Sequence, residues 1–308
     1  MTRRVAVIDC GTNSIRLLVA DVDPARGQLA DVDRRLEIVR LGEGVDRTGR
    51  LAPAALDRTI RALRGYADII AGSAARAVRM VATSATRDAD NAADFAGRVK
   101  EVLGVAPEVV TGDEEARLSF TGATRELAGH HPPPYLVADI GGGSTEFVLG
   151  AERVHAASSV NIGCVRMTER HLHGDPPAAA EVTAATADIE AALDAVGRAV
   201  PVGQARTLVG LAGSVTTVAG IALGLEAYDA SRLHHARATA AQVHDVTRGL
   251  LAATRAGRAA IGLMHPGRVD VIGGGALVLD RIMTRFGFTE VLVSEHDILD
   301  GIAWSLAR

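Results

Sequence analysis

Apolar and polar positions along the chain form short blocks with the periods of strands and helices. Three apolar stretches, at residues 4–9, 15–22 and 28–41, are separated by the turn-forming connectors CGTNS and DPARG, which predicts three strands. A helix is predicted next, because Pro53 suits a first helical position and Gly72 suits a helix end. Its predicted inner face consists of apolar residues at helical spacing: Leu56, Ile60, Leu63, Ala67 and Ile70.

The blocks that follow alternate between strand-like and helix-like patterns. Strands are expected at 77–84 and 107–111, and helices at 91–103 and 114–127. Alternation of this kind requires crossover connections between parallel strands. The sequence therefore predicts an α/β fold.

An internal repeat divides the chain near its middle. The three prolines of GHHPPPYL end the preceding helix and favour an extended chain. The segment VAVIDCGTNSIRLLVA, which starts at Val5, then returns as YLVADIGGGSTEFVLG, which starts at Tyr135. In this alignment Asp9 matches Asp139, and in both copies the acid follows an apolar strand and precedes a turn of small residues. A repeat of half the chain length predicts two domains of similar topology.

The second half continues the alternation of strands and helices. Thr239 and Gln242 have the spacing of a capping box at a helix start, and Gly273–Gly275 open another helix. The segment that contains Arg232 and Arg237 is expected to be a basic loop or a solvated helix end. The remaining expected elements are a helix at 181–199, a strand at 205–212 with a turn at 213–217, a strand at 290–295 and a final helix at 296–306.

The composition narrows the class of protein. A length of 308 residues suffices for two domains, and 48% apolar but only 3% aromatic residues indicate cores of Ala, Val, Leu and Ile. The net charge of −4 argues against a surface devoted to nucleic acid or membrane, so neither is expected as a partner. Two cysteines outside any CxxC spacing, no signal-peptide pattern and no apolar run of about 18 residues favour a cytoplasmic location.

Three glycine-rich turns follow apolar strands, and a fourth glycine segment, Gly273–Gly275, opens a helix. Freed backbone amides at such turns can converge on an anion, and glycine lets the backbone approach it closely. An ordinary turn is the alternative for any single segment, and neither the Walker pattern nor GxGxxG occurs. The candidate phosphate-binding residues in the three turns are Gly11, Thr12, Asn13, Ser14, Gly141, Gly142, Gly143, Ser144, Thr145, Gly213 and Ser214.

Two aspartates that end apolar strands, Asp9 and Asp139, are candidates for contact with a cation. A charge at such a position is costly unless it meets a cation or hydrogen-bond donors. Glu146 is expected to approach Asp139 across a strand pair, and Mg²⁺ is commonly held by one or two carboxylates together with phosphate oxygens. Backbone amides that cap a strand-end acid are the alternative for both aspartates.

The acidic stretch TGDEEARLSF supplies a candidate general base. Thr111 and Glu114 have capping-box spacing, which gives Glu114 a structural role. Glu115 is rotated by about 100° from Glu114 on a helix, so it can face elsewhere and accept a proton from a water that attacks phosphorus. A plain acidic helix start is the alternative.

Arg87, which follows the strand in VATSATRDADN, is a candidate phosphate ligand because its planar guanidinium suits phosphate oxygens. A surface ion pair with Asp88 or Asp90 is the alternative. The ten histidines are expected in loops or at the surface. Neither HExxH nor GxSxG is present, so zinc-protease and serine-hydrolase chemistry have no support.

Six segments together resemble the exopolyphosphatase / guanosine pentaphosphate phosphohydrolase family. In chain order they are VAVIDCGTNSIRLLVA, MVATSATRDADN, VVTGDEEARLSFTGA, VADIGGGSTEFVL, LAGSVTTVAG and LVSEHDILDGI, and they span nearly the whole chain. The resemblance implies two duplicated ribonuclease-H-like domains of the actin, sugar-kinase and heat-shock-ATPase type with a cleft between them. The domains would be 1–128 and 129–295, and the C-terminal helix at 296–308 is a candidate addition to the first.

The resemblance also implies hydrolysis of terminal phosphate from inorganic polyphosphate. By motif position, Glu115 is similar to the family's catalytic base, Asp139 and Glu146 to its acids for Mg²⁺ or Mn²⁺, and Arg87 with the glycine turns to its phosphate ligands. The chain resembles the short, two-domain members, for which a homodimer is expected. The alternatives are a guanosine pentaphosphate 5′-phosphohydrolase, an ATP-using kinase, and a polyphosphate or nucleotide sensor without catalytic activity.

Overall fold

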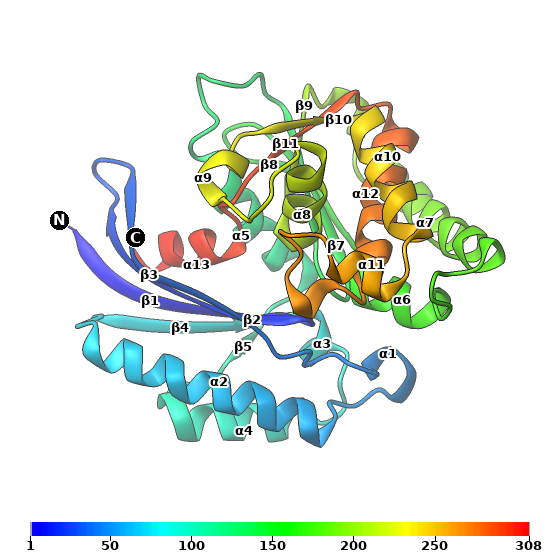
Figure 1. Ribbon diagram of the computed structural model, residues 1–308. Coiled ribbons are helices and arrows are strands. Elements are labelled where there is room, and N and C mark those ends of the chain that lie inside the picture. Colours follow the sequence, from blue (N-terminus) through cyan, green and yellow to red (C-terminus); the bar gives the residue numbers. More distant parts are fainter. Residues whose placement is uncertain (1, 308) are drawn as a thin grey trace. The chain divides into compact units, whose positions relative to one another are not determined.

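The computed structural model describes residues 2–307, which form two compact units (Figure 1). Unit 1 comprises the chain up to Gly122 together with the segment from Ile298 onward, and unit 2 comprises Ala123–Asp297. Each unit contains one mixed sheet that is accompanied by helices. The predicted α/β class is therefore confirmed.

The sheet of unit 1 has the strand order β3-β2-β1-β4-β5. Its first three strands form an antiparallel meander, and the last two run parallel to the first. The three strands predicted at the start of the chain are confirmed, although the third ends sooner than expected. The bounds are β1 (Arg3–Cys10), β2 (Ser14–Asp23), β3 (Gln28–Ile38), β4 (Ala77–Ala82) and β5 (Glu108–Val109).

Helices pack on both faces of this sheet. On one face lie α2 (Pro53–Gly72) and α4 (Ala92–Leu103), and on the other lies α13 (Ile298–Leu306). Consecutive residues of β1 therefore enter different cores, with Ile8 on the side of α2 and Val7 on the side of α13. Because both faces are buried there, β1 is apolar from Val5 to Ile8 and shows no alternation of apolar and polar residues in that stretch.

The sheet of unit 2 repeats this arrangement with one more strand, in the order β10-β11-β9-β6-β7-β8. An antiparallel meander is again followed by parallel strands, and β10 closes the edge in the antiparallel direction. The shared topology agrees with the internal repeat. The bounds are β6 (Tyr135–Ile140), β7 (Thr145–Gly150), β8 (Val154–Val160), β9 (Thr207–Leu211), β10 (Arg237–Thr239) and β11 (Glu290–Val293).

A large apolar core of aliphatic residues lies between this sheet and its helices. Helix α12 packs against α6, α7, α8 and α10, as Figure 1 shows on the right of the ribbon. The bounds are α6 (Cys164–His171), α7 (Ala179–Ala199), α8 (Ala212–Ala222), α9 (Ala230–Leu233), α10 (Ala240–Ala252), α11 (Arg255–Ala259) and α12 (Ile272–Phe286), with 3₁₀ turns at Val202–Gln204 and Pro266–Arg268.

The helices differ in how well their sequence pattern predicts them. Helix α2 has the predicted bounds. The turn predicted at 213–217 is wrong, because these residues lie inside α8. That helix is buried on nearly all sides, so its apolar residues show no helical period. The strand expected at 77–84 gives way to a short helix at its end. The elements that the pattern did not indicate include α1 (Val45–Thr48), α3 (Ser84–Arg87), β8, α6, β10 and α11. Helix α5 spans Gly112–Thr124.

Three half-buried histidines of unit 2 pack against one another. The rings of His234 and His235 stack with centroids 3.8 Å apart, and His131 meets His235 edge-on at 5.7 Å. Burial, assisted by the neighbouring imidazoles, lowers the pKa of His235 to about 4. This ring is therefore neutral at physiological pH.

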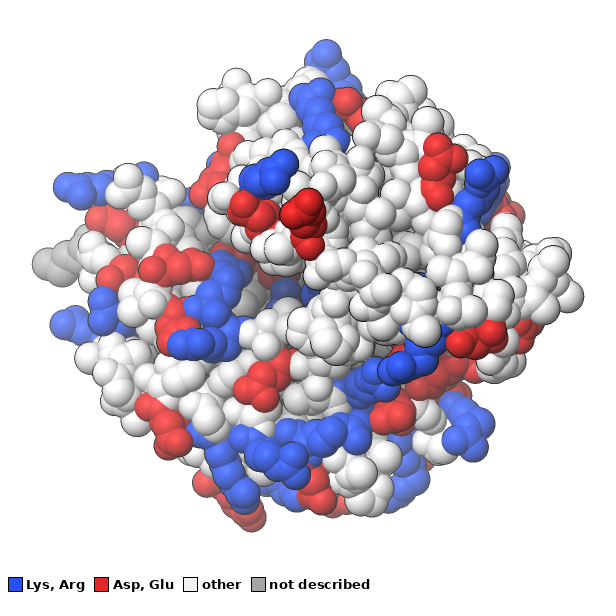
Figure 2. Space-filling model, in the orientation of Figure 1, with Lys and Arg blue, Asp and Glu red and all other residues white. Residues whose placement is uncertain are grey.

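Charges of both signs are interspersed on the face of the molecule shown in Figure 2. Some exposed charges of the protein form close ion pairs, for example Arg98 with Asp57 at 2.6 Å. Within residues 2–307, no helix is both long enough and apolar enough to cross a membrane.

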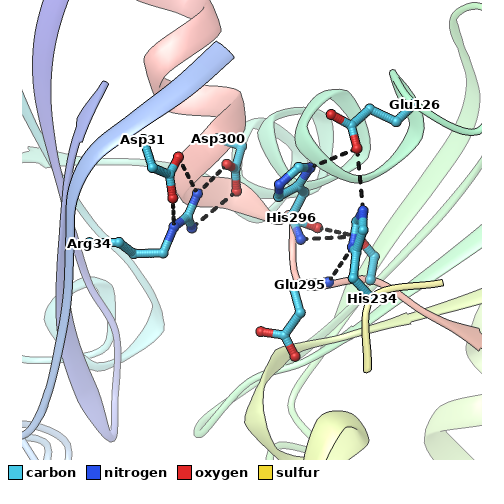
Figure 3. Close-up of polar contacts among 8 residues, drawn as sticks. Asp31, Arg34, Glu126, His234, Glu295, His296 and Asp300 are labelled. Carbon is cyan, nitrogen blue, oxygen red and sulfur yellow. Dashed lines mark hydrogen bonds and ion pairs between the residues drawn. The ribbon is translucent and has the colours of Figure 1, made fainter. Parts of the chain in front are cut away.

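A buried ion pair fastens α13 to the sheet of unit 1. The side chain of Asp300 on α13 is only 2% exposed, and Arg34 of β3 donates to its Oδ1 at 2.5 Å (Figure 3). The same guanidinium donates to Asp31 through Nε at 2.6 Å. Arg34 therefore compensates the charge of a carboxylate that lies in an apolar setting.

We predict that Arg34→Ala lowers the free energy of unfolding by about 3 kcal/mol, because it leaves a buried carboxylate without this cation. The matched control is Arg35→Ala, whose side chain is 58% exposed and pairs with Asp33, and it should change stability by less than about 0.5 kcal/mol. Urea denaturation measures both variants. Equal losses in the two variants would contradict the role assigned to Arg34.

Candidate functional site

The turn that follows β1 has its carbonyl groups engaged by a neighbouring segment. The amide of Gly11 donates to the carbonyl of Ser14 at 2.9 Å, which closes the turn. Three amides of segment 39–42 donate to the carbonyls of Thr12 and Asn13 at 2.8 to 3.0 Å. The carbonyls of this turn therefore point toward that segment.

The turn that follows β6 is built in the same way. The amide of Gly141 donates to the carbonyl of Ser144 at 3.1 Å, and the carbonyls of 141–143 accept the amides of Gly163 and of the first residues of α6 at 2.9 to 3.2 Å. These bonds also satisfy helix amides that have no partner inside α6. The close approach requires glycine at 163, because a Cβ there would overlap the backbone of Gly142.

Because the carbonyls of each turn accept hydrogen bonds from a neighbouring segment, the amides on the other side of the turn remain available to bind an anion. Within residues 2–307, the amides of Thr12, Asn13, Gly142 and Gly143 donate no hydrogen bond to the backbone. Successive backbone amides exposed at a turn form a concavity that binds anions. Both turns thus have the geometry expected of the predicted phosphate sites.

A short helix that the sequence analysis missed links the first turn to Glu115. At the start of α3, Ser84 Oγ lies 2.9 Å from Thr12 Oγ1. At its end, Arg87 Nη1 donates to Glu115 Oε2 at 3.1 Å and to the carbonyl of Val110 at 2.9 Å. The short helix α3 therefore contacts both the first glycine turn and the candidate base, Glu115.

The two neighbouring glutamates of α5 differ in burial, as helix rotation predicts. Glu115 is only 8% exposed, whereas the side chain of Glu114 is 48% exposed and pairs with Arg79. Two further polar atoms, Asn13 Oδ1 and Thr86 Oγ1, are buried without a hydrogen-bond partner among the described residues. Buried polar atoms without a partner are rare, and one of these two, Asn13 Oδ1, lies in the first glycine turn, where a bound ligand would supply the missing partner.

The strand-end acids occupy equivalent positions in the two sheets but face different partners. In unit 1, Asp9 pairs in register with Arg16, whose Nη2 donates to it at 2.6 Å. In unit 2, Asp139 pairs in register with Glu146, so two buried carboxylates face each other across β6 and β7. Ser159 Oγ donates to Glu146 Oε1 at 2.7 Å. Two opposed carboxylates beside a phosphate turn have the chemistry of a magnesium site.

Two arginines of unit 2 that the sequence analysis did not single out lie beside the glycine segments. Arg166 Nε donates to the carbonyl of Gly143 at 2.8 Å. The guanidinium of Arg268 lies against Gly213 in the first turn of α8 and donates to Thr217 Oγ1 at 3.3 Å. No side chain caps this helix end, and the helix dipole opposes a cation there unless an anion binds as well. The position of these arginines therefore supports anion binding, but neither belongs to a motif that would have identified it.

Packing accounts for two of the three glycines in Gly273–Gly275. A Cβ at Gly274 would lie 2.8 Å from the carbonyl oxygen of Cys164, and one at Gly275 would overlap Ser214 Oγ. These glycines let α12 approach α6 and α8 closely. They lie in the first turn of α12, so the prediction that they open a helix is confirmed.

We predict that Gly275→Ala lowers the free energy of unfolding by about 2 kcal/mol, because the added methyl overpacks the contact with Ser214. The matched control is Gly249→Ala in α10, where a Cβ meets open space and alanine favours the helix by up to about 1 kcal/mol. Thermal unfolding should thus shift in opposite directions in the two variants. A shift in the same direction would argue against the packing role.

Neither cysteine has the character of a nucleophile. Burial raises the pKa of the thiols of Cys10 and Cys164 above their usual range. Both therefore remain protonated near neutral pH and act as small apolar residues.

The chain belongs to the Ppx/GppA phosphatase family, whose model matches residues 18–308. It is 52% identical to exopolyphosphatase 2 of Mycobacterium tuberculosis, over 99% of this chain and 98% of that protein. The resemblance inferred from the sequence motifs is therefore confirmed.

Solved structures show the same fold. A crystal structure of an exopolyphosphatase-like protein matches with a TM-score of 0.96 and 43% identity, over 99% of this chain and 98% of that one. The PPX-GPPA enzyme of Aquifex aeolicus matches with a TM-score of 0.82 and 31% identity, over 99% and 100% of the two chains. Both matches extend over the two units.

Proposed function

We propose that the protein is an exopolyphosphatase, which removes the terminal phosphate of inorganic polyphosphate by attack of water. The observation that carries this proposal is the connection from the first glycine turn through α3 to a buried Glu115. The name of the Mycobacterium tuberculosis relative supports the substrate. Membership of a phosphatase family supports the reaction class.

Glu115 acts in this proposal as the general base. Its carboxylate accepts the proton of the attacking water, and the phosphate that leaves carries the oxygen of that water. Arg87 holds the carboxylate through one hydrogen bond and is itself held by the carbonyl of Val110. The base is thus oriented before substrate arrives, which lowers the cost of reaching the transition state.

The phosphate chain would be bound largely by backbone amides. The turns at Gly11–Ser14 and Gly141–Thr145 offer their amides, and Gly213 and Ser214 add the N-terminus of α8. Arg268 and Arg166 supply positive charge beside these amides. Positioning and electrostatic stabilisation of this kind account for most catalysis of phosphoryl transfer.

The carboxylates of Asp139 and Glu146 suit a magnesium or manganese ion, because they are buried, opposed in register and adjacent to a phosphate turn. When bound, the ion supplies charge neutralisation to phosphate oxygens. Ser159 orients Glu146 by a hydrogen bond to Oε1.

A cytoplasmic location and a homodimer also remain predictions.

We predict that Glu115→Gln lowers the rate of phosphate release from polyphosphate of defined length by about 10² to 10⁴-fold, because the amide cannot accept a proton. Binding of the same polyphosphate should persist, since the amide has nearly the shape of the carboxylate. The matched control is Glu114→Gln, which changes the exposed neighbour and should retain activity within a few fold. Phosphate release and equilibrium binding are measured for both variants.

The same assay compares polyphosphate with guanosine pentaphosphate and ATP. Fastest release from polyphosphate is the expected result. If guanosine pentaphosphate is hydrolysed fastest, the proposed substrate is wrong, whereas the assignment of Glu115 as the base stands. Undiminished turnover in Glu115→Gln would remove the base, and binding without any release by the unmodified protein would favour a sensor.

A further inference from the structure

Two histidines and a glutamate of unit 2 that have no role in the proposed hydrolysis converge on one another. Glu126 lies just after α5, His234 follows α9, and His296 lies between β11 and α13 (Figure 3). Glu126 Oε2 is 3.3 Å from His234 Nε2 and 3.3 Å from His296 Nδ1, and all three atoms lie within 4.8 Å of one another. We call these residues the His–Glu cluster.

We propose that the His–Glu cluster is a binding site for a divalent transition-metal ion of the zinc class, separate from the magnesium site of the proposed reaction. Ligand atoms bound at about 2.0–2.1 Å in a tetrahedron lie about 3.3 Å apart, which matches the two distances from Glu126 Oε2. Imidazole nitrogens select zinc, cobalt, nickel or copper rather than magnesium, which prefers oxygen.

The two histidines are held in place before an ion arrives. The ring of His234 packs against those of His235 and His296, with centroid distances of 3.8 and 4.6 Å. Ser294 Oγ donates to the carbonyl of His296 at 2.7 Å and accepts its amide at 3.1 Å. Ordered ligands lower the entropic cost of binding an ion.

The exposure of the cluster leaves a side open for a further ligand. The side chains of Glu126, His234 and His296 are 55%, 23% and 30% exposed. Three protein ligands with solvent access can bind an ion together with water. The site would therefore exchange its ion with solution rather than enclose it.

Binding requires a change of tautomer in His234. The amide of Glu295 donates to His234 Nδ1 at 3.2 Å, so the neutral ring carries its proton on Nε2 and donates it to Glu126. An ion on Nε2 places the ring proton on Nδ1 instead, and the hydrogen bond from Glu295 is lost. The His234 ring remains neutral, and the ion occupies the position of the Nε2 proton that faces Glu126.

The cluster joins the two points at which the chain enters and leaves unit 2. Glu126 is the fourth residue of Ala123–Asp297, and His296 is the last but one. A bound ion would hold these two segments to each other and to His234. The proposed role is therefore to brace the ends of unit 2, and it does not depend on the proposed hydrolysis.

The test uses tag-free, chelator-treated full-length protein in excess Mg²⁺, so that oxygen sites such as Asp139 and Glu146 are saturated. Zn²⁺ is titrated against a chromogenic chelator, and Co²⁺ is titrated while visible absorption is recorded. The expected result is one Zn²⁺ per chain and the intense visible bands of four-coordinate or five-coordinate cobalt. Glu126→Gln and His296→Ala should each weaken Zn²⁺ binding at least about tenfold.

The matched control is His244→Ala, which removes a histidine of α10 that contacts Asp280 outside the cluster and should leave Zn²⁺ binding unchanged. Circular dichroism verifies that each variant is folded. No Zn²⁺ binding by the unmodified protein would overturn the proposal, and so would equal binding in Glu126→Gln, His296→Ala and His244→Ala. Because the readout is metal binding, failure of the exopolyphosphatase proposal would leave this result intact.

Discussion

The rest of this structure depends on a pair of glycine-rich turns. The carbonyl groups of each turn accept hydrogen bonds from the backbone amides of a neighbouring segment. In unit 1 the segment 39–42 supplies the donors, and in unit 2 the N-terminus of α6 supplies them. The amides of the turns are then available on the opposite side, with glycine at 141–143 allowing close approach. A polyanion can be bound in this way by a protein whose net charge is −4, because fixed backbone dipoles replace a basic surface.

Duplication of the fold has produced two turns of one design with different roles. The acid at the end of β1 is matched by Arg16, which compensates its charge within the protein. The equivalent acid of unit 2 faces Glu146, and this pair instead suits a metal ion that binds together with phosphate. A single difference at one register position thus distinguishes a structural ion pair from a candidate metal site. In unit 1 the proposed catalytic carboxylate is Glu115, which α3 connects to the turn through Arg87.

Local pattern was sufficient for much of the fold and for some of the site. Amphipathic α2, the meander of unit 1 and the opposition of Asp139 and Glu146 all follow from periodicity and spacing. Helix α8 was missed because burial on nearly every side removes the helical period. Arg268 and the His–Glu cluster were missed for another reason. Their partners are distant in sequence and are brought together only by the packed sheet and its helices.

The central claim is that the amides of the glycine turns bind the phosphate chain that Glu115 helps to hydrolyse. The most direct test is a crystal structure of the Glu115→Gln protein with tripolyphosphate and Mg²⁺. The account predicts phosphate oxygens within hydrogen-bonding distance of the amides of Gly142 and Gly143, and Mg²⁺ coordinated by Asp139 or Glu146. Tripolyphosphate ordered elsewhere, with these amides facing only water, would contradict it.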